Sequence, residues 1–332
     1  MQTVLVTGGL GYIGSHVVIE LVENGYNVVI LDNCHNSNES TDIDLRKIAG
    51  SKANKIIFHK GDLLDKSCVM DVFNNHSIDF VIHLAGLKSV TDSISDPLNY
   101  YQINLGIMLN LLEVMTKFGC KKLIFWSSAN VYGNQKAPVN ENNPTGSGIT
   151  NPYGKTKYMC EEILKDFSVA NQSWSVVILR YFNPIGAHSS GLIGENPLNS
   201  PNNLMPVIIR AVKSDSVIKI FGGDYPTKDG TCERDFVHVM DLANGHIIAI
   251  KKLSTPGTHT YNLGTGKPTS VLQLINTFSN ITGKKIKYEI VKRRLGDIII
   301  SYADISKINN EFGWMATRSL DEMCLDAWKF NN

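Results

Sequence analysis

The chain has almost no net charge and no long apolar run. Its 332 residues include 32 Lys and Arg against 31 Asp and Glu, a formal net charge of +1. Holding a nucleic-acid backbone needs a basic surface, so this balance disfavours a nucleic-acid partner. No apolar run approaches the ~18 residues of a membrane helix, and residues 1–6 lack the cationic start of a secretion signal. We therefore expect neither membrane insertion nor secretion. With 43% hydrophobic residues, the composition is that of a globular protein.

Cysteine is sparse and never closely paired. The six cysteines stand at positions 34, 68, 120, 160, 232 and 324, with no C-x-x-C pair. The nine histidines show neither zinc-finger nor H-E-x-x-H spacing. We expect reduced thiols, a cytoplasmic protein and no metal site.

Strands and helices alternate over the first 180 residues. Short β-branched or apolar runs predict strands, and apolar residues at helical spacing predict the helices between them. The predicted strands are 3–7, 28–31, 56–59, 80–84, 122–126 and 175–181, and the predicted helices are 12–24, 66–76, 101–118 and 153–170. Such alternation is typical of an α/β fold with a doubly wound parallel sheet of the Rossmann type.

The pattern weakens after Asn183. Residues 188–203 are rich in Gly, Pro, Asn and Ser, and predicted helices follow at 206–213, 241–252, 270–281 and 320–329, with a strand at 286–291. Short strands at 236–239 and 261–263 are candidates to return to the first sheet. We expect a Rossmann-type domain over residues 1–182, with return segments near 235–263, and a smaller C-terminal α/β domain over 183–332.

A glycine motif stands between the first strand and the first helix. Gly8, Gly11 and Gly14 have the G-x-x-G-x-x-G spacing that lets a backbone turn tightly and approach a pyrophosphate. Asp32 ends the second strand, where an acid accepts the ribose hydroxyls of NAD and repels the 2′-phosphate of NADP. Without that context, the motif describes only a tight turn.

Two further strand ends carry polar residues. Asp62 follows the third strand, and Ala85 to Lys88 follow the fourth. Ligands of open parallel sheets bind at these ends, so Asp62 is expected to face the adenine and Lys88 the phosphates. Lys88 could equally be a surface lysine that contacts only solvent.

Ser128 after the fifth strand and the pair Tyr153 and Lys157 form the most informative pattern. A spacing of four puts phenol and ammonium on one helix face. Tyrosine ionises near 10, so a fixed cation is needed for it to act as a base at neutral pH. Y-x-x-x-K also occurs as a plain helix-face pair, but here it follows a dinucleotide fingerprint and a strand-end serine.

At these residues the chain resembles the extended short-chain dehydrogenase/reductase family, and within it the nucleotide-sugar 4-epimerases. The resemblance runs nearly end to end. It is carried by T-G-G at 7–9, G-Y-I-G-S-H at 11–16, H-L-A-G-L-K at 83–88, Y-G-K-T-K at 153–157, R-Y-F-N-P at 180–184, N-N-L-M-P at 202–206 and Y-N-L-G at 261–264.

The resemblance implies a set of ligand contacts. For NAD these are Gly8, Gly11, Tyr12, Ile13, Gly14, Asp32, Asn33, Cys34, His35, Asn36, Ser37, Asp62, Leu63, Leu84, Ala85, Gly86, Leu87, Lys88, Asn104, Tyr153, Lys157 and Phe182. For a UDP-sugar they are Ser128, Tyr153, Asn183, Asn203, Leu204, Lys219, Ile220, Phe221, Arg234, Arg294, Leu295, Gly296, Asp297 and Ser301. Without the resemblance, we would interpret Arg234 and Arg294 as ordinary surface arginines. Trp126 departs from the family, which more often has serine there.

The resemblance also implies the reaction. The family's 4,6-dehydratases have T-D-E-V-Y-G after the fifth strand, whereas residues 128–133 are S-A-N-V-Y-G and lack the acid pair that eliminates water. We therefore expect an isomerase that interconverts UDP-galactose and UDP-glucose through a 4-keto sugar, with hydride returned from tightly bound NAD. Ser301, where narrow-specificity members have tyrosine, opens the option of N-acetylated UDP-sugars. A dehydratase or decarboxylase of the same family is the alternative, and a homodimer through helices 101–118 and 153–170 is expected.

Overall fold

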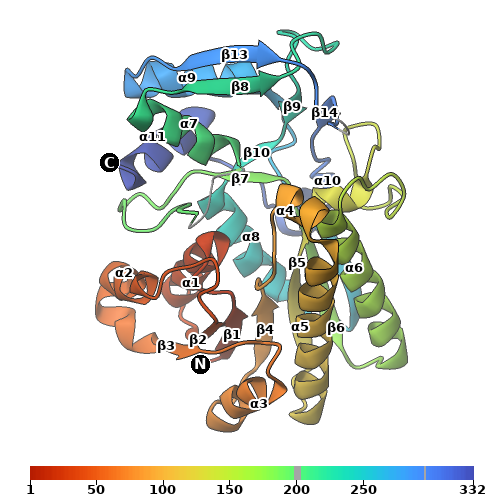
Figure 1. Cartoon of the computed structure of the whole chain (residues 1–332). Helices are drawn as coiled ribbons and strands as arrows, with labels where there is room; N and C mark the ends of the chain where they lie inside the picture. The colour runs from red at the N-terminus through yellow and green to blue at the C-terminus, as the bar shows by residue number, and fades with distance from the viewer. Residues whose placement is uncertain (198–202, 295–296) are drawn as a thin grey trace. The chain divides into compact units, whose positions relative to one another are not determined.

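The computed structural model describes residues 1–197, 203–294 and 297–332. The chain divides into two compact units (Figure 1). Unit 1 comprises Met1–Gly133, Thr145–Arg180 and Ala243–Tyr261, and unit 2 comprises Asn134–Pro144, Tyr181–Leu242 and Asn262–Asn332. Among the described residues, no helix is both long and apolar enough to cross a membrane.

A seven-stranded sheet organises unit 1. Its strands are β1 (Thr3–Thr7), β2 (Asn27–Asp32), β3 (Ile56–Lys60), β4 (Phe80–His83), β5 (Lys122–Ser128), β6 (Ser175–Tyr181) and β11 (Gly257–Leu263), in the order β11-β6-β5-β4-β1-β2-β3. β1 pairs in parallel with both β2 and β4. The strand order reverses between β1 and β4, which is where doubly wound sheets bind dinucleotides. The predicted α/β class is confirmed.

Helices cover both faces of this sheet. They are α1 (Tyr12–Glu23), α2 (Ser40–Ala49), α3 (Lys66–Asn75), α4 (Val90–Ser95), α5 (Pro97–Lys117), α6 (Pro152–Ala170) and most of α8 (Val239–Ile250), with 3-10 turns η1 (Gly50–Lys55), η2 (Ala129–Tyr132) and η3 (Lys251–Ser254). α5 begins at Pro97, four residues before the predicted start, because proline at the first helical position already has a helical φ.

The packing of the core explains why the sequences of the strands are continuously apolar. Leu5, Val81 and Leu123 pack in one cluster with residues of α3, α5 and α6. Their neighbours along the strands, such as Val4 and Ile82, are equally buried. Because side chains alternate between the two faces of a strand, both faces of the sheet must be covered, and no polar alternation remains in the sequence.

Unit 2 contains three small sheets packed with helices. β7 (Asn183–Ile185) pairs with β10 (Phe236–His238), β8 (Val217–Phe221) pairs with β13 (Lys287–Val291), and β9 (Glu233–Arg234) lies between β12 (Thr269–Ser270) and β14 (Ile300–Ser301). The helices are α7 (Leu204–Ser214), α9 (Val271–Thr282), α10 (Ser306–Phe312) and α11 (Leu320–Phe330). Two segments were candidates to return to the first sheet. Residues 261–263 do so as part of β11, whereas residues 236–238 form β10 and pair with β7. Next to this pairing, the Asn183 amide donates to the Asp235 carbonyl at 2.9 Å.

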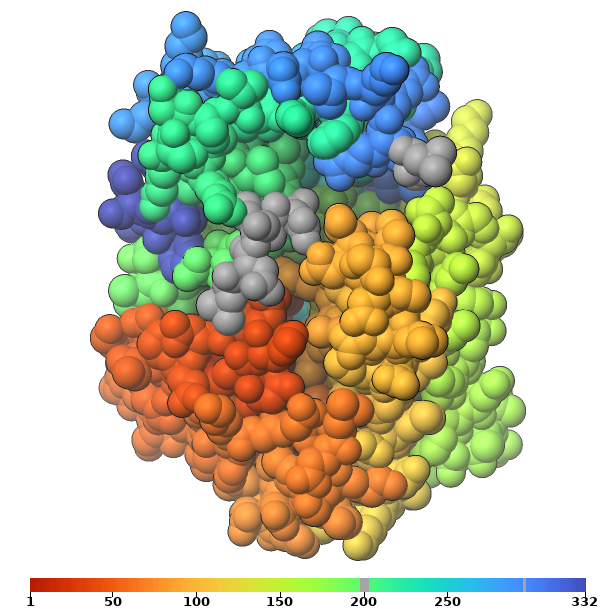
Figure 2. Space-filling model, viewed as in Figure 1, coloured from red at the N-terminus to blue at the C-terminus, as the bar shows by residue number. Residues whose placement is uncertain are grey.

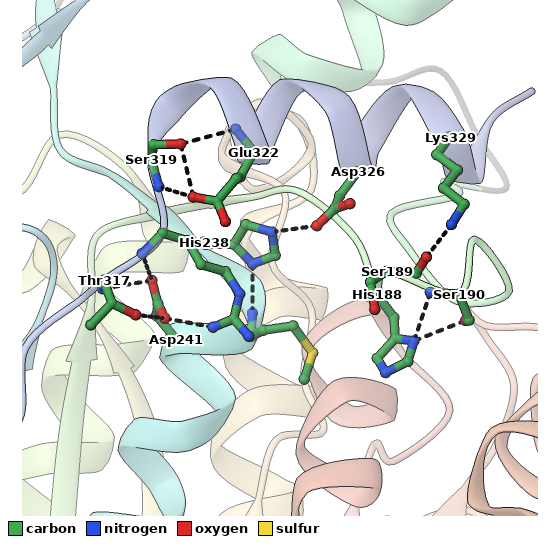
Figure 3. A network of polar contacts seen from close by, with 12 residues as sticks. His188, Ser189, Ser190, His238, Asp241, Thr317, Ser319, Glu322, Asp326 and Lys329 are labelled. Carbon is green, nitrogen blue, oxygen red and sulfur yellow. Dashed lines mark hydrogen bonds and ion pairs between the residues drawn. The ribbon is translucent and has the colours of Figure 1, made fainter.

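A polar network ties α11 to the start of α8 within unit 2 (Figure 3). Asp241 accepts bonds from the backbone amides of Thr317 and Arg318 at 3.1 and 2.9 Å, and from the Arg318 guanidinium at 2.6 Å. The Met240 amide donates to Nδ1 of the buried His238, so Nε2 carries the proton toward Asp326 at 3.2 Å. Burial lowers the pKa of His238 to about 3, so this histidine is a neutral structural link.

Candidate active site

The glycine loop after β1 forms a cradle that only glycine can line. Gly8 has φ +71°, and a Cβ there would lie 2.7 Å from the Ala85 amide nitrogen. A Cβ on Gly14 would lie 2.1 Å from the Gly8 carbonyl oxygen. Gly11 is the N-cap of α1 and has no side chain to cap it. The N-terminus of α1 therefore lies beside a bare backbone turn, an arrangement that suits a pyrophosphate.

Asp32 is fixed at the end of β2 by three hydrogen bonds. Its Oδ2 accepts from the Leu10 amide of the glycine loop at 3.0 Å. Its Oδ1 accepts from the Cys34 amide and from Ser37 Oγ, both at 2.9 Å. Since a carboxylate oxygen has two lone pairs, Oδ2 retains one for a further donor such as a ribose hydroxyl.

The neighbouring loops carry the other residues predicted to bind the adenosine. Asn33 donates to Asp62 Oδ2 at 3.0 Å, which links the loop after β2 to the loop after β3. The Leu64 amide donates to the other oxygen of Asp62 at 2.8 Å. His35, Asn36 and Ser37 belong to the same loop as Asn33, and buried Leu63 follows Asp62.

Asn104 holds the loop after β4 in place. Its Oδ1 accepts from the Leu87 amide at 2.8 Å, and its Nδ2 donates to the Leu87 carbonyl and to Thr156 Oγ1 at 3.1 and 3.0 Å. The amide is thus committed to the Leu84–Lys88 segment, where Gly86 has φ +149°. The structure therefore gives Asn104 a positioning role that the resemblance alone did not supply.

Lys88 lies beside the beginning of α1. The residue is half-buried, and its Nζ is 5.8 Å from the centre of the Tyr12 ring. Tyr12 and Ile13 open the helix directly after Gly11. Of the two alternatives for Lys88, this placement favours a role near the glycine loop over an isolated, solvated lysine.

Ser128, Tyr153 and Lys157 are all buried in unit 1, on elements that pack together. Ser128 ends β5, and Tyr153 and Lys157 lie one turn apart on α6, which packs against β5 and η2. The helix is set by Asn151, whose Oδ1 accepts from the Gly154 amide at 2.8 Å, and by Pro152 at the first position. Ser128 Oγ accepts from the amide and side chain of Asn130 at 3.2 and 3.0 Å.

Burial dominates the titration of the two catalytic candidates on α6. It raises the pKa of Tyr153 well above its usual 10, while a hydrogen bond with Ser128 acts in the opposite direction. Burial also lowers the pKa of Lys157 to about 7. Ser128 is thus the neighbour that favours the phenolate in this structure, and the expected lowering of the Tyr153 pKa by Lys157 stays a prediction.

Trp126 covers Lys157, a contact that the sequence pattern did not predict. Lys157 Nζ donates to the Trp126 carbonyl at 3.0 Å and lies 3.7 Å from the centre of its ring. The same ring centre is 6.4 Å from that of Tyr153. The signal in the sequence was the departure itself, a large aromatic residue two positions before Ser128. A cation this close to an indole face is stabilised electrostatically.

In unit 2, three of the residues predicted to bind the UDP-sugar lie together. Arg234 on β9 is in register with Ser301 on β14. The Arg234 guanidinium is 3.6 Å from Asp297 Oδ1 and donates to the Ile298 carbonyl at 2.7 Å. One basic, one acidic and one small side chain therefore meet at this sheet.

The remaining predicted substrate residues are placed in several ways. Phe221 ends β8, and the Arg294 guanidinium lies 3.9 Å over the centre of its ring. Ile220 is buried in the core of unit 2, whereas Lys219 is exposed. Asn203 is the N-cap of α7, directly before Leu204, and Nδ2 of Asn203 donates to Glu195 at 2.5 Å.

Phe182 is buried and Asn183 is exposed. Leu295 and Gly296 lie outside the described residues.

Asp235, directly after Arg234, is a functional candidate that the sequence analysis missed. Its carboxylate accepts from the amides of Thr265, Gly266 and Ala303 at 2.7, 3.0 and 3.1 Å. Burial raises the pKa of Asp235. The acid ties the loop after β11 to the backbone of Ala303, two residues beyond Ser301. An Arg-Asp pair before an apolar strand was the only sequence signal for it.

The fold and the site define a class. A glycine cradle where the order of a parallel sheet reverses, with buried serine, tyrosine and lysine on β5 and α6, is the arrangement of a dinucleotide-dependent enzyme of the Rossmann type. The chain belongs to the NAD dependent epimerase/dehydratase family, whose sequence profile matches residues 4–264.

The similarity extends to particular relatives over nearly the whole chain. The chain is 49% identical to the UDP-glucose 4-epimerase of Mus musculus, with 99% of this chain and 96% of that protein covered. It is 50% identical to the UDP-glucose 4-epimerase of Yersinia enterocolitica, with 99% and 97% covered. The crystal structure of the Bifidobacterium longum UDP-glucose 4-epimerase, in complex with NAD⁺ and UDP, matches with a TM-score of 0.95 at 44% identity and covers 99% and 98% of the two chains. These proteins confirm the family resemblance.

Proposed function

We propose that the chain is an NAD-dependent isomerase that interconverts UDP-galactose and UDP-glucose by epimerisation at C4. The observation that carries the proposal is the buried set of Ser128, Tyr153 and Lys157 on β5 and α6, in a chain nearly half identical to UDP-glucose 4-epimerases over its length. A dehydratase is disfavoured, because Ala129 and Asn130 follow Ser128 where elimination would need two carboxylates.

The residues present fit NAD. Gly8 and Gly14 admit no Cβ, so the glycine loop packs closely on the start of α1 as in dinucleotide-binding turns, and Asp32 retains a lone pair for a ribose hydroxyl. We assign the dinucleotide to residues 1–182 and the UDP-sugar mainly to residues 183–332. When bound, NAD⁺ supplies a reversible hydride acceptor for C4.

The residues of the chain handle the proton and the sugar. Tyr153 takes the proton of the 4-hydroxyl as general base, Ser128 hydrogen-bonds the same oxygen, and a 4-keto sugar results. Lys157 favours the phenolate form of Tyr153. The sugar then turns about its bond to the anchored UDP, and Tyr153 returns the proton to the oxygen of the opposite epimer.

The nucleotide part of the substrate stays bound while the sugar rotates. We assign the diphosphate to Arg234 and Arg294, because a planar guanidinium meets two phosphate oxygens at once. Phe221 offers an aromatic face for the uracil, and Asp297 offers a carboxylate for the uridine ribose. Binding energy at this remote part retains the keto intermediate while the sugar itself stays loosely held.

Product analysis tests the proposed reaction. Incubating the protein with UDP-galactose and separating the nucleotide sugars is expected to yield UDP-glucose, and UDP-glucose is expected to yield UDP-galactose. A 4-keto-6-deoxy sugar would identify a dehydratase, and turnover of UDP-glucuronate to a pentose would identify a decarboxylase. Either outcome without epimerisation contradicts the proposal.

Ser301 is proposed to decide which sugars fit. A serine in register with Arg234 leaves room that an acetamido group on C2 can occupy. We expect interconversion of UDP-N-acetylgalactosamine and UDP-N-acetylglucosamine, and Ser301→Tyr is expected to lower the kcat/KM ratio of acetylated to plain substrate by about 10–100-fold. Ser301→Ala, which keeps the space, is the control. No activity of the native protein on acetylated sugars, or an unchanged ratio in Ser301→Tyr, would show that Ser301 is not the gate.

We propose a homodimer through α5 and α6. The two helices pack side by side and reach the surface together (Figure 2). They carry exposed apolar side chains, with Leu98 71%, Leu109 46% and Val169 78% exposed. Light scattering is expected to give twice the 36.7 kDa of one chain, and Leu109→Glu is expected to shift the protein toward monomer. A native mass of one chain would refute the dimer.

A cytoplasmic location is proposed from the cysteines. All six are free thiols, four of them buried. Free thiols persist in a reducing compartment such as the cytoplasm.

A further inference from the structure

A buried ion pair lies behind the residues that carry the reaction. Glu161 stands one helical turn beyond Lys157 on α6, and Arg180 stands near the end of β6. Arg180 Nε donates to Glu161 Oε1 at 3.0 Å, and Nη2 donates to Oε2 at 2.6 Å. The side chains are 3% and 0% exposed. The pair is therefore bidentate and out of reach of solvent and substrate.

Two more groups extend this pair toward Ser128. Ser127, the residue directly before Ser128 on β5, donates through Oγ to Glu161 Oε1 at 2.5 Å. Arg180 Nη1 donates to the hydroxyl of Tyr132, and the guanidinium lies 4.7 Å from the centre of the Tyr132 ring. Tyr132 ends η2, the turn that begins after Ser128. One network thus joins β5, η2, α6 and β6.

Stability alone gives little reason for such a network. Removing two charges from water costs several kcal/mol per ion, and a well-packed apolar pair is often as stable as a buried ion pair. The ion pair adds a defined geometry. A bidentate guanidinium fixes both the distance and the orientation of the two elements that it joins, whereas apolar packing allows them to shift along each other. The elements fixed in this way are those that carry Ser128, Tyr153 and Lys157.

We propose that Glu161 and Arg180 are positioning residues, which set the register of β5 against α6 so that Ser128 meets Tyr153 at reacting distance. This inference rests on the proposed function. Catalytic groups must be held within about 0.5 Å of their working geometry, and a shift of about 1 Å lowers the rate by as much as ~10²-fold.

The test replaces both charges at once, so that no unpaired charge is left buried. The double variant Glu161→Leu/Arg180→Met is expected to keep a Tm close to native and a Kd for UDP within about threefold, because the nucleotide is held elsewhere. Its kcat is expected to fall at least about 10-fold with KM little changed. The matched control is Glu162→Leu/Lys165→Met, which removes an exposed ion pair one residue further along the same helix and is expected to leave kcat within about twofold of native.

The pH profile separates positioning from a merely structural role. When the Ser128–Tyr153 contact loosens, the bond that lowers the pKa of Tyr153 weakens. The pH at which kcat rises should therefore move upward in the double variant, while the control keeps the native profile. A double variant with native kcat and native profile overturns the proposal.

A milder change covers the case in which the double variant does not fold. Ser127→Ala removes one bond to Glu161 and leaves the charges paired. It is expected to lower kcat by about 3–10-fold without lowering UDP affinity. A native kcat in that variant overturns positioning. Inactivity of the native protein on UDP-sugars would overturn the proposed function and this inference together, so the two failures are distinguishable.

Discussion

Replacing Tyr153 by phenylalanine is expected to lower kcat on UDP-galactose by about 10²–10⁴-fold, the loss typical of a missing general base. Only the hydroxyl disappears, so the ring still packs beside Trp126 and the helix keeps its Asn151 cap. The content of bound NAD and the affinity for UDP should therefore remain native. Steady-state kinetics together with UDP titration measure both.

Tyr158→Phe is the matched control for this prediction. Tyr158 lies on the same helix, half-buried, with its ring close to Gly146. It should keep native kcat. Ser128→Ala is expected to be milder than Tyr153→Phe, because the phenol can still reach the hydroxyl alone. Undiminished turnover in Tyr153→Phe would contradict the assignment of the base.

Lys157→Met is expected to move the onset of activity to higher pH and to reduce kcat at neutral pH by at least about 10²-fold. The phenolate of a buried tyrosine is disfavoured, and the variant removes the cation placed one turn away on the same face. The rate should be followed from about pH 6 to about pH 10. Lys155→Met, an exposed lysine two residues earlier, is the control. An unchanged low-pH limb would show that Lys157 does not act on Tyr153.

Lys157→Met is also expected to change how the free energy of unfolding depends on pH. The pKa of Lys157 is about 7 in the folded chain and about 10.5 in the unfolded chain. Between these values the unfolded chain binds more protons, so stability rises with pH over this window, and the penalty for burying the charge is fully present below about pH 7. Lys157→Met should remove this rise, measured as the free energy of unfolding of cofactor-stripped protein.

The local part of the site was predictable from the sequence. The glycine spacing of Gly8 to Gly14, Asp32 at a strand end and the four-residue spacing of Tyr153 and Lys157 depend only on neighbours along the chain. Periodicity therefore located them, and the structure places them on the expected strand ends and helices.

The contacts that adjust the site were not predictable in this way. Glu161 meets Arg180 across two different elements, and Lys157 meets the Trp126 ring only because α6 packs on β5. The resemblance implies that Asn104 contacts NAD, which stays a prediction, but it does not show that the Asn104 amide also holds the loop at Leu87. Such pairings depend on how side chains pack in three dimensions, and neither spacing nor composition records them.

Each hydride taken from the sugar is expected to return to it within one turnover. The most direct measurement supplies purified protein with UDP-galactose, without added NAD⁺, and follows UDP-glucose formation together with absorbance in the reduced-nicotinamide band. We expect complete approach to equilibrium on the cofactor that co-purifies, with only a transient rise in absorbance. A need for stoichiometric NAD⁺, with NADH accumulating as UDP-galactose is consumed, would identify a dehydrogenase and contradict epimerisation.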